Sequence, residues 1–197
     1  GVTAQSLWSR GGYTTGFELF KKFLRIIFGK KMIPVGRSKE KQKAMSNSFI
    51  RYLWLTIAML DLIFLYAIII RIKSFLGKVI ICDRYLDDTY IDFSLNFPKS
   101  NFNKMWLWKL LTATLPKPDF CFLFTLSVEN SIYRSNLKNE PFPDSKEVLQ
   151  QRLDMYKLSA LFDAADWVKI NGDDTIVFSA EIIKKKLFPM LKDNNAS

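Results

Sequence analysis

The 197-residue sequence contains no histidine and only two cysteines. Without imidazole, Ser-His triads, histidine general bases and histidine-ligated metal centres are excluded. Two thiols are too few for a structural zinc site. Cys82 and Cys121 both lie inside apolar runs typical of strands. They therefore indicate buried free thiols in a reducing, cytoplasmic compartment rather than a disulfide framework.

A second absence is the Gly-x-x-x-x-Gly-Lys-Ser/Thr loop, whose backbone amides cradle the phosphates of a bound nucleotide. The pairs Gly29-Lys30 and Gly77-Lys78 have neither its spacing nor its hydroxyl residue. No signal-peptide pattern is present either.

Acidic residues are scarce at the start of the chain. Residues 1–51 contain 11 Lys and Arg against 2 acids, net +9, and residues 52–197 contain 18 against 17, net +1, which together give +10. This basic N-terminal region should therefore meet something anionic, such as phosphates, nucleic acid or a membrane surface.

The longest apolar run extends from Leu53 to Ile70 and is 18 residues long. That length is the lower limit for crossing a bilayer, and Asp61 at its middle would cost about 2.5–3.5 kcal/mol on insertion. We expect a helix from about Ser48 to Phe75 that is buried inside a soluble α/β protein and does not span a membrane. A transmembrane segment is the alternative.

Short apolar runs at residues 79–82, 119–126 and 167–170, and a weaker one at residues 2–8, are typical of strands. They alternate with stretches of helical periodicity, among them residues 101–115, a helix to about Leu137, one from Ser145 to about Phe162, and one from Thr175 to Leu191. This alternation predicts one domain with a doubly wound parallel sheet and helices on both faces. The segment from Leu86 to Pro98 is expected to be a loop or a short helix start.

The segment Gly77 to Tyr85, GKVIICDRY, is predicted to be a strand buried on both faces that ends in Asp83-Arg84-Tyr85. Ligands of open parallel sheets bind outside the carboxyl ends of the strands. An acid and a guanidinium at that edge suit a Mg²⁺-phosphate ligand. A surface ion pair is the simpler alternative.

Four segments resemble motifs of the thymidylate kinase family of P-loop nucleoside monophosphate kinases. They are GKVIICDRY, KPDFCFLFTLSVENSIYR, QQRLDMYKL and WVKINGDDTIVFSAEII, in the family's order over about residues 77–185. The resemblance implies the P-loop kinase fold and ATP-dependent, Mg²⁺-assisted phosphoryl transfer to a nucleoside monophosphate. It also implies a homodimer formed through the Ser48–Phe75 helix, and no nucleic-acid partner.

The resemblance also assigns roles around the central strand. Arg84 would hold the acceptor phosphate, and Asp83 would work with Mg²⁺ or its waters. Tyr85 would shape the acceptor pocket, although core packing explains that ring equally well. Arg10, in a Gly-rich turn two residues shorter than the family's, would be the second phosphate ligand.

In the lid region, about residues 128–160, Arg134 and Arg152 would reach the phosphates of ATP as the lid closes. The alternative for both is a solvated helix face. The lid loop KNEPFPDS offers only Lys138 as a cation, unlike the Arg-rich lids of one branch of the family.

Positions that read the base in the family differ here. Leu62 stands where an Arg would be expected and Ala58 where an aromatic residue would stack, so the base of the acceptor is uncertain. Asp87, Asp88 and Asp92 follow the motif. Asp88 is a candidate substrate ligand, and all three could instead be solvated.

Because the family's phosphate loop precedes the strand at residues 2–8, we expect the chain to be a piece of a longer kinase. By itself it would be inactive and would lack the strand between residues 79–82 and 120–126. The alternative function is a non-catalytic module whose basic N-terminal region docks on an anionic membrane surface or nucleic acid.

Overall fold

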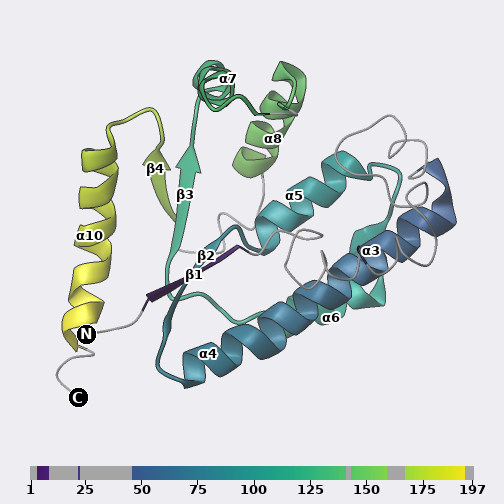
Figure 1. The fold of residues 1–197 in the computed structure, drawn as a ribbon, viewed down its shortest axis with the longest axis horizontal. Helices are drawn as coiled ribbons and strands as arrows, with labels where there is room; N and C mark the ends of the chain where they lie inside the picture. Colours follow the sequence, from purple (N-terminus) through teal and green to yellow (C-terminus); the bar gives the residue numbers. More distant parts are fainter. Residues whose placement is uncertain (1–3, 9–21, 23–45, 141–142, 159–166, 194–197) are drawn as a thin grey trace. The chain divides into compact units, whose positions relative to one another are not determined.

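The computed structural model describes residues 4–8, 22, 46–140, 143–158 and 167–193. Contacts divide the chain into two compact units, Gly1–Lys117 (unit 1) and Pro118–Ser197 (unit 2). Figure 1 shows the helices and strands of both. The single domain expected from the sequence stays a prediction.

The described residues of unit 1 form one long helix, two strands, two shorter α-helices and a short 3-10 helix. In chain order these are β1 (Ala4–Trp8), α3 (Ser48–Ile63), η1 (Phe64–Ile70), α4 (Arg71–Phe75), β2 (Val79–Asp83), α5 (Leu86–Asn96), η2 (Phe102–Lys104) and α6 (Trp106–Thr114). The segments α3, η1 and α4 form a continuous helix, Ser48–Phe75, hereafter the long helix. The side chain of Asn47 caps its start by accepting hydrogen bonds from the first backbone N–H groups. The bounds expected for this helix are confirmed.

The strands β1 and β2 pair in parallel, with Ala4 opposite Val79 and Trp8 opposite Asp83. One face of this pair packs on the core of unit 1. The other face carries Val79 and Ile81, which are 41% and 56% exposed. The expectation that β2 is buried on both faces is therefore wrong. The long helix and its neighbours supply apolar side chains to one face only.

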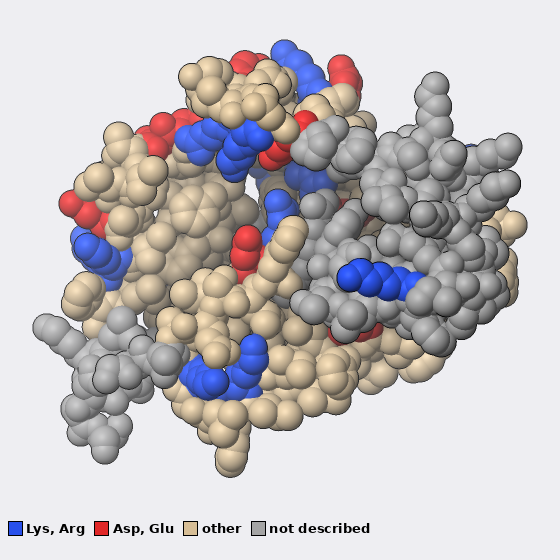
Figure 2. All heavy atoms as spheres, viewed as in Figure 1, with Lys and Arg blue, Asp and Glu red and all other residues tan. Residues whose placement is uncertain are grey.

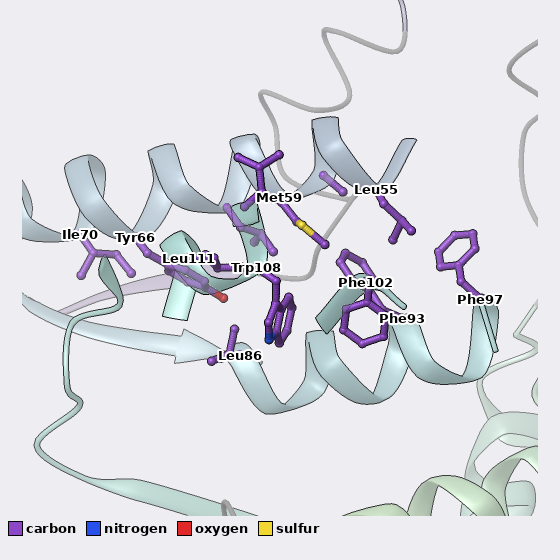
Figure 3. Packing of buried hydrophobic residues seen from close by; sticks show 13 residues of the cluster. Leu55, Met59, Tyr66, Ile70, Leu86, Phe93, Phe97, Phe102, Trp108 and Leu111 are labelled. Atoms are coloured by element: carbon purple, nitrogen blue, oxygen red, sulfur yellow. The ribbon is translucent and has the colours of Figure 1, made fainter. Parts of the chain in front are cut away.

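The core of unit 1 lies under the inner face of the long helix. Figure 3 shows side chains of this face pointing at aromatic residues of α5, η2 and α6. The buried cluster consists of Leu55, Ala58, Met59, Leu62, Tyr66, Ile70, Leu86, Phe93, Phe97, Phe102, Leu107, Trp108 and Leu111. Its rings meet mostly edge to face, as at Phe93 and Phe102, whose centroids are 5.4 Å apart.

The outer face of the long helix is also apolar but remains exposed. Leu60, Phe64 and Ile68 are 49%, 54% and 44% exposed. The expectation of a fully buried helix is thus wrong for this face, because the other elements of unit 1 cover only the inner one. Among the described residues, the long helix is the single candidate that is long and apolar enough to cross a membrane. A third of its most apolar 18-residue stretch is buried. Partly buried core helices of soluble proteins have the same length and composition.

Two further expectations are corrected between β2 and β3. The segment after Tyr85, expected to be a loop or a short helix start, is the 11-residue helix α5, so the loop alternative is wrong. Its apolar positions Leu86, Tyr90, Phe93 and Phe97 recur at helical spacing and pack on the core. The helix expected over residues 101–115 is divided, because the extended backbone of Met105 separates η2 from α6.

Unit 2 contains β3 (Cys121–Thr125), α7 (Val128–Leu137), α8 (Lys146–Leu158), β4 (Trp167–Asn171) and α10 (Ile176–Asp193). The strands β3 and β4 pair in parallel, with Cys121 opposite Trp167. The hydroxyl of Ser127 accepts a hydrogen bond from the N–H of Asn130 and caps α7. The expected end of α8 near Phe162 lies outside the described residues.

The described strands form two parallel pairs, β1-β2 in unit 1 and β3-β4 in unit 2. Parallel pairing with helical connections is compatible with an α/β kinase fold. Larger parallel sheets are the rule in such folds. The doubly wound three-layer arrangement stays a prediction.

Neighbouring leucines of α6 test the position of the core. Leu111 is fully buried, whereas Leu110 is 39% exposed. Leu111→Ala should lower the free energy of unfolding by about 2–5 kcal/mol, because it leaves a cavity beneath the long helix. Leu110→Ala, the matched control, should cost about 1 kcal/mol or less. Urea unfolding measures both, and equal losses would contradict this core.

Candidate functional site

The candidate site begins where β2 turns into α5. Asp83 ends the strand with an exposed side chain, and Arg84 follows with φ of 76°. Tyr85 is extended and precedes the first helical residue, Leu86. Left-handed backbone costs an L-residue about 1–2 kcal/mol. This local conformation turns the chain sharply at the carboxyl end of a parallel strand.

The carboxylate of Asp88 holds this turn together. One of its oxygens accepts a hydrogen bond from the backbone N–H of Tyr85 at 3.1 Å. The other accepts from the Arg84 guanidinium, also at 3.1 Å. The arrangement is the N3 half of a capping box. Arg84 thus forms an ion pair with Asp88, whereas the sequence suggested a pair between the strand-end residues Asp83 and Arg84 themselves. The Arg84 side chain stays 37% exposed.

Tyr85 links this turn to the core. Its hydroxyl donates to the carbonyl of Pro116 at 2.7 Å, and its ring centroid lies 4.8 Å from that of Tyr66 on the long helix. The core-packing interpretation of Tyr85 is thus confirmed. A role in shaping an acceptor pocket stays a prediction.

The first turn of α5 carries two adjacent acids. Burial, and then the negative charge of Asp88, raise the pKa of Asp87 above its ordinary value. Asp92 is 5% exposed. The expectation that these acids are simply solvated is therefore wrong for Asp92, and Asp87 is also partly desolvated.

A Mg²⁺ ion at this end of β2 would have few protein carboxylates as ligands. Among the described residues, no group of three or more acids or cysteines is arranged to hold a metal ion. Mg²⁺ in phosphoryl-transfer sites is commonly held by one or two carboxylates together with substrate phosphates and waters. The exposed carboxylate of Asp83 fits that limited role.

The two arginines that the resemblance assigns to a lid, Arg134 and Arg152, lie on α7 and α8 of unit 2. The guanidinium of Arg134 donates to the carbonyl of Gly172 at 2.7 Å and so links α7 to the turn after β4. Arg152 has a side chain that is 14% exposed, and its guanidinium lies 3.8 Å from the carboxylate of Asp144. The solvated-face alternative is therefore wrong for Arg152, which is mostly buried and paired, whereas Arg134 is exposed on its helix and makes one hydrogen bond. The reach of both residues toward ATP stays a prediction.

Asp173, which was not predicted from the sequence, links the turn after β4 to the start of α7. Its carboxylate accepts hydrogen bonds from the backbone N–H and hydroxyl of Ser127, and from the amide of Asn130 at 2.7 Å. The bond from Asn130, aided by Ser127 and the positive charge of Arg134, holds the pKa of Asp173 below its ordinary value. The signal in the sequence is the turn NGDD, whose acids favour such backbone contacts.

The structure therefore brings Asp83, Arg84, Tyr85 and Asp88 together in unit 1, and places Arg134 and Arg152 on neighbouring helices of unit 2. Arg10, the proposed second phosphate ligand, lies outside the described residues. Most of the basic N-terminal region lies outside them too, so its docking on an anionic partner stays a prediction.

No family model matches the sequence. A thymidylate kinase of Bartonella henselae is 27% identical over 115 residues, which cover 55% of this chain and 53% of that protein. The chain thus spans about half the length of this relative. The match supports a kinase-like relationship.

The backbone of Arg84 can be tested by two substitutions that both remove the ion pair with Asp88. Glycine adopts positive φ freely, whereas alanine keeps the cost of the left-handed backbone. Arg84→Gly should therefore unfold with a free energy about 1 kcal/mol higher than that of Arg84→Ala. Chemical denaturation measures the difference, and alanine being the more stable would contradict the positive φ.

Asp173 should make unit 2 sensitive to acid. Because its pKa is lowered in the folded state, its contribution is present above the ordinary value of 3.8 and is lost as the pH falls through the folded pKa. Asp173→Asn should lower the melting temperature at neutral pH, and the difference from the parent should vanish in strong acid. The exposed Asp174→Asn is the control. A difference independent of pH would contradict the network.

Proposed function

We propose that the chain is part of a nucleotide kinase, which transfers the γ-phosphoryl group of ATP to a nucleoside monophosphate with the help of Mg²⁺. The observation that carries the proposal is the Asp83-Arg84 pair at the carboxyl end of the parallel strand β2. Ligands of α/β sheets bind at this edge. The thymidylate kinase relative supports the same class of reaction.

Each residue of the turn has a distinct role in this proposal. Phosphoryl transfer is catalysed mainly by positioning and charge neutralisation. Arg84 would clamp the acceptor phosphate with its planar fork, which Lys cannot reproduce. Asp88 holds the guanidinium in place, and Asp83 would bind the waters or the ion of the Mg²⁺-ATP complex.

The donor site requires a further part. The 197 residues contain no Gly-rich Lys-Ser/Thr loop. We therefore propose that a segment of a longer protein holds the phosphates of ATP and that Arg134 and Arg152 add to it from the lid. The reducing cytoplasm is the compartment in which this reaction would take place.

The acceptor's base stays open. Ala58 and Leu62, which stand at the family's base-reading positions, are fully buried in the core of unit 1. They offer neither an aromatic face nor a hydrogen-bond donor to a ligand. We expect the acceptor's phosphate, more than its base, to be recognised strongly.

A homodimer through the long helix is part of the proposal. The exposed residues Leu53, Leu60, Phe64 and Ile68 are spaced by about one or two helical turns and share its outer face. A second copy would cover this stripe. Analytical ultracentrifugation of the full-length protein would measure the mass directly.

Turnover by the full-length protein tests the proposed reaction. ADP release would be measured with a panel of nucleoside monophosphates, in the presence and absence of Mg²⁺. Arg84→Lys should lower kcat/KM about 100-fold, because a preorganised fork on the phosphate is lost. Arg71→Lys is the control, since Arg71 donates to the carbonyl of Thr114 on α6.

Two results would contradict the proposal. One is the absence of turnover with every monophosphate in the panel. The other is an Arg84→Lys variant with the activity of the parent protein.

A further inference from the structure

The end of the long helix carries an apolar tip that the proposed reaction does not use. Phe75 is 92% exposed and Leu76 is 63% exposed, and Ile72 and Val79 beside them in the sequence are 53% and 41% exposed. Gly77, with φ of 72°, reverses the chain immediately afterwards. The tip is therefore a convex corner between α4 and β2, with its largest side chain almost wholly in solvent.

Backbone hydrogen bonds fix the shape of this corner. The N–H of Gly77 donates to the carbonyl of Ser74 at 2.9 Å, and the N–H of Lys78 donates to the carbonyl of Lys73 at 3.1 Å. Together with the positive φ of Gly77, these bonds form a Schellman motif. The tip is thus a defined turn.

Two lysines occupy the positions that this motif usually fills with an apolar pair. In a Schellman motif, the residues joined by the outer hydrogen bond commonly make a hydrophobic contact. Here those residues are Lys73 and Lys78. The negative end of the helix dipole favours one lysine there. It does not account for two like charges beside an exposed Phe and Leu.

The charge around the tip has one sign. From Leu62 to Cys82 the sequence contains Arg71, Lys73 and Lys78 and no acid. Figure 2 shows basic side chains over the end of α4. Lysine stems can lie along apolar groups while their ammonium heads reach outward. A surface with anionic groups above an apolar layer therefore matches both the charge and the apolar side chains.

We propose that the α4–β2 corner docks the protein on the surface of a membrane rich in anionic lipids. Phe75 and Leu76 enter the interface, and Lys73 and Lys78 meet the lipid phosphates. A fluid bilayer accepts a convex tip without a preformed pocket, which a protein partner would need. The membrane is bound from one side and is not crossed. This inference is independent of the proposed kinase activity.

Vesicle cosedimentation of the full chain tests the proposal. The protein should bind vesicles that contain one third phosphatidylglycerol and bind pure phosphatidylcholine weakly. Phe75→Ser should weaken binding about tenfold or more, because the largest inserted side chain is lost. Phe49→Ser is the matched control. Phe49 is 75% exposed at the opposite end of the same helix, about 39 Å away by helical rise.

The lysines provide a second, electrostatic measurement. The double variant Lys73→Gln with Lys78→Gln should weaken binding to anionic vesicles about tenfold or more. The exposed pair Lys104→Gln with Lys109→Gln is the control of equal charge. High salt should release the parent protein, because the Debye length falls from about 10 Å at 0.1 M to about 3 Å at 1 M.

Four results would overturn the proposal. One is a parent protein that does not bind anionic vesicles, and another is equal weakening of binding by Phe75→Ser and Phe49→Ser. Resistance to release by alkaline carbonate would show instead that the long helix crosses the bilayer. A change in oligomeric mass on Phe75→Ser, with vesicle binding intact, would show that a second copy covers the tip.

Discussion

The packing of the long helix on α5 and α6 is the interaction on which unit 1 depends. Its inner face supplies fully buried side chains, including Leu55, Met59 and Tyr66. These side chains pack in one cluster with aromatic rings of α5, η2 and α6. Each buried side chain of this size contributes about 1.5–3 kcal/mol. Because β2 packs on the same cluster, the core also fixes where the strand ends and the turn to α5 begins.

The packing of the core also fixes the turn between β2 and α5. Tyr85 is held by the ring of Tyr66 and by the carbonyl of Pro116, so its backbone cannot move without disturbing the core. The preceding residue, Arg84, is left with positive φ, and Asp88 engages its guanidinium. A local cost in backbone energy is tolerated when the surrounding structure compensates for it. The result is a charged fork in a fixed position at a strand end.

Sequence patterns predicted where the helices and strands lie better than they predicted which of their faces are buried. Strong apolar periodicity identified the long helix, and β-branched runs identified the strand at Val79, because both signals are local. Burial of a side chain depends on which distant elements pack against it, and this cannot be read from the local sequence. Ile81 and Phe64 were expected to be buried but are exposed. The segment after Tyr85 was expected to be a loop or only the start of a short helix because its aspartates are typical of loops, whereas Asp88 caps an 11-residue helix. The candidate site residues Asp83 and Arg84 could be selected from their position at the end of a strand and from the family resemblance. The positive φ of Arg84 and its pairing with Asp88 could not be predicted from the sequence.

In the proposed kinase, recognition of a base and stability of the core would require different side chains at the positions of Ala58 and Leu62. Both residues are fully buried. An arginine at the position of Leu62 would need a partner for a charge placed among apolar groups, which is costly without one. Leucine removes that cost and fills the space beneath the helix. In the proposed kinase, leucine at this position would also leave no guanidinium to read a base. In the proposed kinase, a core this apolar would leave recognition to residues at its edge such as Arg84, whose side chain is 37% exposed, and would favour an acceptor identified by its phosphate.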